Sequence, residues 1–207
     1  MFATVSGRRP AGASGGAGAA LRYNGAIRQA KESEGAMGEQ PQVLIDELDI
    51  HPSAYIFPNT FLAGAISIGA ESSIWPMSVL RADTVPITIG ARSNVQDGCI
   101  IHGDPGFPVV IGDGVTLGHG AVVHGAVLED DVLIGIGAVV LNGARIGRGS
   151  VVGARALVTE GTQVPPGSLV LGVPGRVRPL GPAQAARIRE AAEHYVERKE
   201  RYRRRGL

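Results

Sequence analysis

The chain has 207 residues, which is enough for one well-filled core, and it carries 20 Lys and Arg against 19 Asp and Glu. A net charge of +1 provides no general electrostatic attraction for nucleic acid or for a membrane surface, so neither is expected as a partner. The single cysteine, Cys99, excludes an internal disulfide framework and suits the reducing cytoplasm, and no apolar stretch reaches the roughly 18 residues of a membrane span.

Residues 1–42 are dominated by Gly, Ala and Ser and lack a sustained apolar period. Such a composition cannot bury enough apolar surface to order a chain, so we expect a disordered N-terminal extension. Several basic residues precede the first acid, Glu32, which is typical of an organelle transit peptide. An alternative is that translation begins at Met37, and the sequence leaves both interpretations open.

From Ile50 to Val164, aliphatic residues recur at every sixth position with a few breaks. A helix has a period of 3.6 and an ordinary strand a period of 2, so this period indicates short strands joined by tight corners. Many of the repeat residues precede a glycine, as expected where the backbone turns or approaches a neighbouring coil. The repeat positions are Ile50, Ile56, Leu62, Ile68, Ile74, Leu80, Ile89, Val95, Ile101, Ile111, Leu117, Val123, Leu128, Ile134, Val140, Ile146, Val152, Val158 and Val164.

This pattern resembles the hexapeptide-repeat proteins, whose fold is a left-handed parallel β-helix. Three faces make one coil, so the nineteen repeat positions predict about six coils over residues 43–181. The handedness follows from the resemblance, since the usual crossover rule favours the opposite hand. The predicted fold class is therefore all-β, with the repeat residues facing the axis of the β-helix.

A different pattern begins where prolines and glycines between residues 172 and 181 end the repeat. Over residues 182–207, Ile188, Ala191, Ala192 and Tyr195 fall on one helical face, with charged residues elsewhere. We expect a C-terminal α-helix that packs along the β-helix.

Two of the chain's five histidines occupy matching places in successive coils. If the extra residues after Leu80 and Ile101 form corner loops, Leu80, Ile101 and Val123 align on the third face of the coil. His102 and His124 follow the last two, so we expect them one above the other at the strand spacing of roughly 4.8 Å. That separation suits two imidazoles that share a metal ion.

His119 follows Leu117 on the second face, where it is not expected to reach the other two imidazoles within one chain. A threefold assembly would bring the second face of one subunit against the third face of the next, and the site would form across that interface. On the same grounds Asn94, Gln96 and Asp97 share the second face with His119. The sequence therefore favours a homotrimer.

Several short motifs narrow the resemblance to the γ-class carbonic anhydrase family. Their order and spacing are similar over roughly residues 43–181. The motifs are VLRAD at 79–83, SNVQDG at 93–98, IIHG at 100–103, LGHGAVVHG at 117–125 and GIGAVVLNGA at 135–144. The resemblance implies a homotrimeric enzyme that hydrates CO2 reversibly to bicarbonate, with one zinc or iron(II) site at each subunit interface.

Carried over residue by residue, the resemblance makes His102, His119 and His124 the metal ligands. Three neutral imidazoles leave an open position on a tetrahedral zinc ion, and zinc-bound water in carbonic anhydrases has a pKa near 7. The resulting hydroxide would attack CO2. Imidazole suits both zinc and iron(II), so the identity of the metal stays open.

The same resemblance assigns supporting roles to five polar residues. Asn94 and Gln96 would position solvent and substrate, because an amide can do so without a change of charge. An equally good interpretation of Gln96 is an amide that satisfies backbone groups at the interface. Arg81, Asp83 and Asp97 would tie the subunits together near the site, with Arg81 and Asp97 forming an ion pair across the interface.

Two acids of the best-studied branch of the family are missing from this sequence. In that branch a glutamate follows the RAD aspartate, a second one stands on a loop after the first metal histidine, and a carboxylate exports the proton. Here Thr84 and the short loop GDPGFP at 103–108 occupy those places, and Asp104 is the only acid. The sequence therefore predicts slow CO2 hydration or none.

Other classes of function fit parts of the pattern. Acyltransferases of the hexapeptide-repeat superfamily use a histidine base and acyl-CoA, but they need no metal-spaced histidines. A metal-dependent acyl-CoA thioesterase could use the same hydroxide. A noncatalytic scaffold could use the metal only to hold the trimer together.

Overall fold

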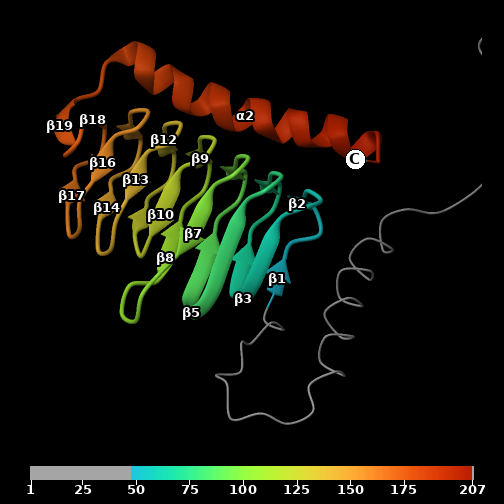
Figure 1. The fold of residues 1–207 in the computed structure, drawn as a ribbon. Coiled ribbons are helices and arrows are strands. Elements are labelled where there is room, and N and C mark those ends of the chain that lie inside the picture. The colour runs from blue at the N-terminus through green and yellow to red at the C-terminus, as the bar shows by residue number, and fades with distance from the viewer. Residues whose placement is uncertain (1–47, 207) are drawn as a thin grey trace, which may run out of the picture. The chain divides into compact units, whose positions relative to one another are not determined.

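The structure, a computed structural model, describes residues 48–206. Within this range the chain forms a left-handed parallel β-helix followed by one α-helix, which is the expected fold class (Figure 1). The disordered extension expected over residues 1–42 lies outside the described residues.

The strands of the β-helix belong to two sheets. The first sheet covers two faces, because β5 pairs with β7 on one face and with β8 on the next. It contains β1 (Leu48–Ile50), β3 (Phe61–Ile68), β5 (Val79–Ile89), β7 (Ile100–His102), β8 (Val109–Ile111), β10 (Val122–His124), β11 (Val127–Leu128), β13 (Val139–Val140), β14 (Arg145–Ile146), β16 (Leu157–Val158) and β17 (Gln163–Val164). The second sheet contains β2 (Tyr55–Ile56), β4 (Ser73–Ile74), β6 (Asn94–Val95), β9 (Thr116–Leu117), β12 (Leu133–Ile134), β15 (Val151–Val152), β18 (Ser168–Leu171) and β19 (Arg176–Pro179).

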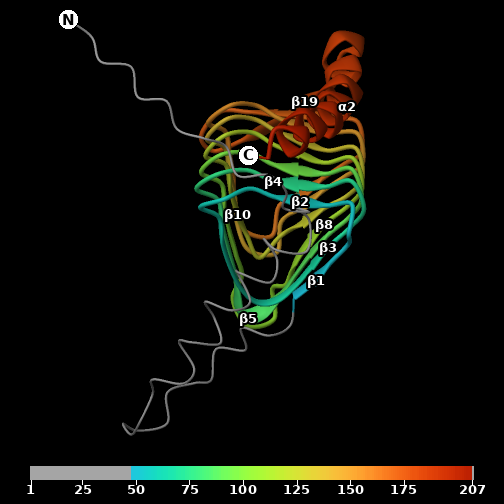
Figure 2. The same ribbon diagram turned by 90° about the vertical axis from the view of Figure 1, so that its right-hand side faces the viewer.

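The second sheet has one parallel strand per turn from β2 to β18, which gives about seven turns where the repeat predicted about six. The final strand, β19, is antiparallel to β18 and ends the stack. Seen along its axis, the turns of the β-helix superimpose (Figure 2). The second sheet makes the second face, while β7, β10, β13 and β16, together with the N-terminal parts of β3 and β5, make the third face.

The aliphatic repeat residues fill the axis of the β-helix. Every one from Leu62 to Val164 is buried, and Ile134, for example, lies in register between Leu117 and Val152. Burial of one such side chain contributes about 1.5–3 kcal/mol. The turns stack so closely that a Cβ on Gly135 would lie 2.5 Å from the backbone nitrogen of Ala154, which explains the glycine after the repeat residue.

Cys99 belongs to this core and is fully buried. Burial raises the pKa of its thiol to about 12, so the side chain stays a neutral thiol at physiological pH. The structure therefore gives Cys99 a packing role.

One of the two expected corner loops is absent. The extra residues after Leu80 lie inside β5, which pairs with β3 on both sides of a register shift: Gly64 pairs with Ala82, and Ile66 pairs with Ile87. This shift lets the strand bend from the third face to the first without leaving the sheet at either end. The extra residues after Ile101 do form a loop, which separates β7 from β8 and projects from its corner (Figure 1).

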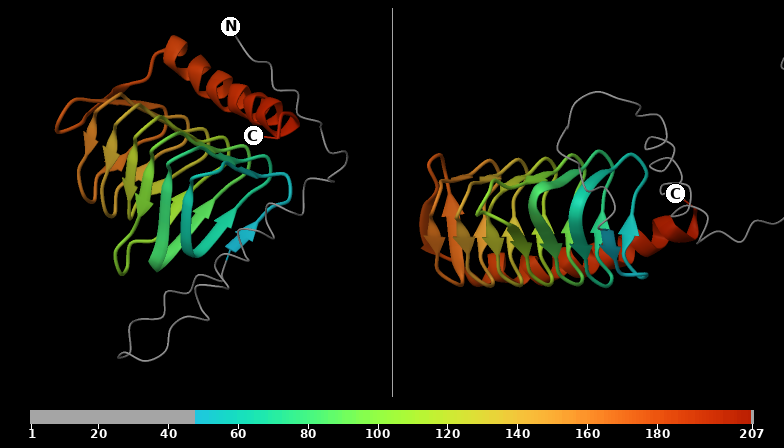
Figure 3. Two further views of the ribbon diagram at one scale, coloured as in Figure 1. Left: turned by 45° about the vertical axis from the view of Figure 1, so that its right-hand side comes forward. Right: turned by 90° about the horizontal axis from the view of Figure 1, so that it is seen from below.

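The C-terminal helix, α2 (Pro182–Arg204), lies along the β-helix, as expected (Figure 3). It contacts β4, β6, β9 and β15 of the second face, and its buried residues include Ile188, Ala192 and Tyr195. The Tyr195 ring packs edge-on against Trp75, with ring centroids 5.1 Å apart. None of the helices among the described residues is long and apolar enough to cross a membrane.

The helical pattern did not single out Lys199, whose side chain is also buried. Its Nζ donates to the carbonyl oxygen of Ser53 at 3.3 Å and to Oε1 of Glu200 at 2.6 Å. A buried ammonium group requires such partners. Lys199 therefore joins α2 to the segment between β1 and β2.

Candidate metal centre

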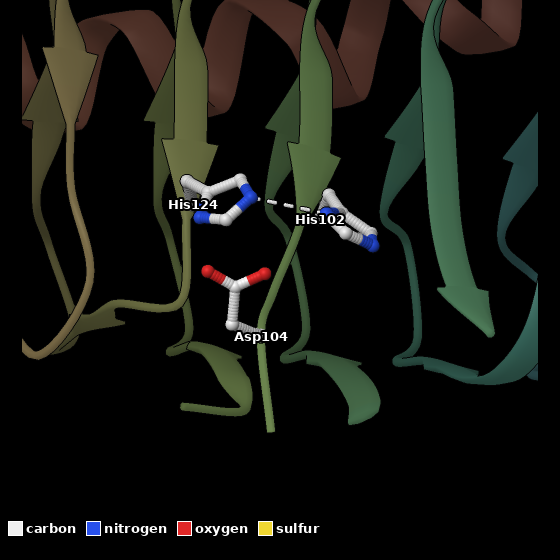
Figure 4. Close-up of side chains that lie close together, drawn as sticks. All are labelled: His102, Asp104 and His124. Carbon is white, nitrogen blue, oxygen red and sulfur yellow. Dashed lines mark hydrogen bonds between the residues drawn. The ribbon is translucent and has the colours of Figure 1, made fainter. Parts of the chain in front are cut away.

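His102 and His124 meet on the outside of the third face. Strands β7 and β10 pair in parallel, and their register puts His102 directly opposite His124. Nδ1 of His102 lies 3.0 Å from Nε2 of His124 (Figure 4). Two ligands on a tetrahedral zinc ion at 2.0–2.1 Å are roughly 3.3 Å apart, so these two nitrogens fit one ion.

Asp104 brings a carboxylate to the same place. It stands at the start of the loop between β7 and β8, and Figure 4 shows its carboxylate directed toward the two imidazoles. One ligand atom from each of His102, Asp104 and His124 lies within 4.8 Å of the others. Imidazole nitrogens with a carboxylate oxygen form a donor set that suits zinc or iron(II).

The remaining nitrogen of each imidazole has a partner in the chain. Nε2 of His102 lies 3.3 Å from Oδ1 of Asp83, and Nδ1 of His124 lies 2.8 Å from Oδ1 of Asn142. Partners of this kind fix the orientation and tautomer of metal-binding imidazoles. Asn142 stood within one of the sequence motifs without an assigned role, and it lies in the turn that follows β13.

Arg81 supports the carboxylate beside His102. Its Nη1 donates to Asp83 at 2.7 Å, and Arg81 lies opposite His102 in the strand register. Partial burial raises the pKa of Asp83, but the hydrogen bond and the charge of Arg81 outweigh it and hold that pKa below its usual value. Asp83 is therefore an ionised acceptor at neutral pH.

His119 lies apart from the other two histidines, after β9 of the second sheet. Its Nδ1 is 3.0 Å from Oδ2 of Asp97, and both side chains are 47% exposed. Within one chain the structure therefore does not bring His119 to His102 and His124. The ion pair expected between Arg81 and Asp97 of neighbouring subunits stays a prediction.

Asn94 and Gln96 are both buried at the second face. Nδ2 of Asn94 donates to Oγ1 of Thr116 at 2.9 Å, and Nε2 of Gln96 donates to Oδ1 of Asn94 at 3.1 Å. These hydrogen bonds fix the orientation of both amides. Like His119, the two amides do not share a sheet with His102.

A row of apolar side chains runs along the third face beside the two histidines. Each residue of the row stands one position before a repeat residue, and the sequence provided no separate indication of it. Its exposed members include Phe61 at 54% and Ile100 at 47%, and an exposed apolar row of this kind is typical of a protein interface. The residues, which pair in register, are Phe61, Val79, Ile100, Val122, Val139 and Leu157.

Comparison with known proteins identifies the family. Residues 125–160 match the repeat family described as bacterial transferase hexapeptide (six repeats). A probable carbonic anhydrase from Methanocaldococcus jannaschii is 47% identical over 148 residues, which cover 71% of this chain and 93% of that protein. The chain belongs to the γ-class carbonic anhydrase-like family of hexapeptide-repeat proteins. The mitochondrial gamma carbonic anhydrase 1 of Arabidopsis thaliana is 36% identical over 153 residues, 70% of this chain and 56% of the plant protein.

One similar solved structure is named as an acyl-transferring enzyme and not as a carbonic anhydrase. A putative acetyltransferase from Bacillus cereus is 38% identical and superimposes with a TM-score of 0.73 over 75% of this chain and 91% of that one. The γ-class carbonic anhydrases are metal-dependent, and the group formed by His102, Asp104 and His124 is a possible metal site.

Proposed function

We propose that the protein is a γ-carbonic anhydrase that hydrates CO2 reversibly to bicarbonate at metal sites between the subunits of a homotrimer. The observation that carries the proposal is the pair of imidazole nitrogens 3.0 Å apart, with the Asp104 carboxylate beside them. The 47% identity to a probable carbonic anhydrase supports the same reaction. Because the chain has a single cysteine and so no internal disulfide, the cytoplasm is the favoured compartment of the protein.

The features that support a homotrimer lie on two faces. The third face carries the apolar row that begins at Phe61, next to His102 and His124. The second-face corner carries His119 and Asp97, which are both half-exposed. Contact between these faces in neighbouring subunits would complete a set of three histidines at each interface. It would also bring Asp97 toward Arg81, and Asn94 and Gln96 toward the substrate.

His102 and His124 of one subunit, with His119 of the next, would hold the metal ion. When bound, a zinc or iron(II) ion supplies the Lewis acidity that ionises water near neutral pH. Asp83 and Asn142 hold the two imidazoles that belong to the same chain.

Three further residues act on the substrate and the proton, and a fourth position lacks the carboxylate of another branch. The amides of Asn94 and Gln96 orient solvent and CO2 without changing charge. Asp104 is the carboxylate next to the imidazoles that can accept the released proton. Thr84 stands where another branch of the family has a carboxylate, so one acceptor is lost and we expect slow turnover.

A second candidate function is hydrolysis or transfer of an acyl group from an acyl thioester. The likeness to the putative acetyltransferase from Bacillus cereus favours it. The same histidine nitrogens would serve a metal-dependent thioesterase, so the site geometry fits both reactions. Assays with CO2 and with acyl-CoA as substrates distinguish the two functions.

Stopped-flow CO2 hydration by protein purified anaerobically tests the proposal, with bound metal quantified in each sample. We expect the rate of hydration to follow the metal content. Loss of a residue that only supports a ligand usually costs about 10–100-fold, so loss of the proposed ligand in His124→Ala should lower the rate at least about 100-fold. The control is His194→Ala, because His194 is exposed on α2. Full metal occupancy without hydration would contradict the proposal, and cleavage of acyl-CoA by that protein would support the second candidate.

A further inference from the structure

We propose that Asn142 is a positioning residue of the metal centre, which holds His124 in the tautomer that offers Nε2 to the ion. This inference rests on the proposed function, because it assumes that His124 binds metal. Asn142 lies in the next coil of the β-helix after the one that carries His124, and its amide lies between the imidazole and the Asp104 carboxylate.

The hydrogen bonds of Asp104 decide which way the Asn142 amide faces. Nδ2 of Asn142 donates to Oδ2 of Asp104 at 2.8 Å, and an ionised carboxylate can only accept. Oδ1 of Asn142 is therefore the atom that faces His124, 2.8 Å from Nδ1. Because Oδ1 can only accept, Nδ1 of His124 must carry the hydrogen. The lone pair of that imidazole is then on Nε2, the nitrogen that lies 3.0 Å from His102.

The local backbone leaves room for this amide only because residue 125 is glycine. Gly125 has φ +57°, and a Cβ there would lie 2.1 Å from Oδ1 of Asn142. The loop that carries Asp104 packs against the same part of the β-helix, because the Phe107 side chain of this loop lies over both Gly125 and Gly143. The backbone nitrogen of Phe107 also donates to the carbonyl oxygen of Asp104 at 2.8 Å. The backbone at Gly125 and the loop residue Phe107 therefore both support the hydrogen bonds that join Asp104, Asn142 and His124.

Zinc affinity, measured by chelator competition on the full-length chain, tests this role without any assay of catalysis. Asn142→Ala removes the acceptor and should weaken zinc binding by about 10–100-fold, as loss of an outer partner usually does. The double variant Asn142→Asp/Asp104→Asn exchanges the amide and the carboxylate. The new carboxylate can accept from Nδ1–H of His124 and from the new amide, so we expect affinity within about threefold of the wild type.

The matched control is Gln163→Ala. Nε2 of Gln163 donates to the carbonyl oxygens of Gly143 at 3.2 Å and Gly161 at 3.1 Å, so this variant deletes an amide at the same corner without touching an imidazole. Its zinc affinity should equal that of the wild type. If wild-type protein binds neither zinc nor iron(II), the proposed function itself fails.

Two results would overturn the positioning role while the proposed function stands. One is wild-type zinc affinity in Asn142→Ala. The other is a loss in the double variant as large as in Asn142→Ala, because a group that only fills space would not be rescued by the exchange. Unfolding midpoints of the metal-free proteins show whether each variant keeps the fold.

Discussion

Subunits that carry His119→Ala are expected to regain metal when they assemble with subunits that carry His102→Ala. Each variant alone breaks every interface site, because His119 and His102 come from different subunits. In a mixed trimer one interface joins an intact His102–His124 pair to an intact His119. Co-expression with two affinity tags isolates the mixed trimers, which should bind about one ion each against about three in the wild type.

A particular result of that experiment would contradict the interface site. If His119→Ala alone keeps full metal occupancy, the ion is held by His102, Asp104 and His124 of a single chain, whose ligand atoms already lie within 4.8 Å of one another. Absence of recovery in mixed trimers, with each variant alone empty, would contradict it as well. Mixtures of His102→Ala with His124→Ala are the control, because both changes affect the same half of the site and no recovery is expected.

Replacing Ile111 with alanine is expected to lower the free energy of unfolding by about 2–5 kcal/mol, as is usual for large-to-small changes in a packed core. Ile111 is 1% exposed and lies in register between Ile89 and Leu128. The neighbouring Val110 points outward and is 38% exposed, so Val110→Ala should change that free energy by less than about 0.5 kcal/mol.

Guanidinium unfolding at one fixed protein concentration measures both variants, because subunit association would otherwise change the apparent stability. Equal losses for Ile111→Ala and Val110→Ala would contradict the assignment of the repeat residues to the core. Metal should be removed beforehand, so that binding to the folded state does not mask the difference.

The repeat predicted which residues face the axis, and with them the alignment of His102 and His124. A period of six assigns each residue to a face and to a direction, and strand pairing then sets the spacing between turns. It does not predict how an insertion is accommodated. The segment after Leu80 continues β5, whereas the one after Ile101 leaves the sheet as a loop.

The hydrogen-bond partners within the site depend on the conformation of that loop and could not be predicted from the repeat. Asp104 was noted only as a remaining acid, and Asn142 was quoted in a motif without a role. Their hydrogen bond at 2.8 Å joins residues 38 positions apart, and its existence depends on how Phe107 seats the loop. The repeat alone contains no signal for such a contact, because side chains two turns apart meet only through the loop's conformation.

Anomalous diffraction from crystals of the metal-loaded protein, recorded at the zinc and iron absorption edges, shows which residues bind the ion. We expect one anomalous peak per interface, about 2.0–2.1 Å from nitrogens of His102 and His124 and of His119 of the neighbouring subunit. The edge at which the peak appears identifies the metal. A peak coordinated by His102, Asp104 and His124 of one chain, with His119 remote, would contradict this expectation.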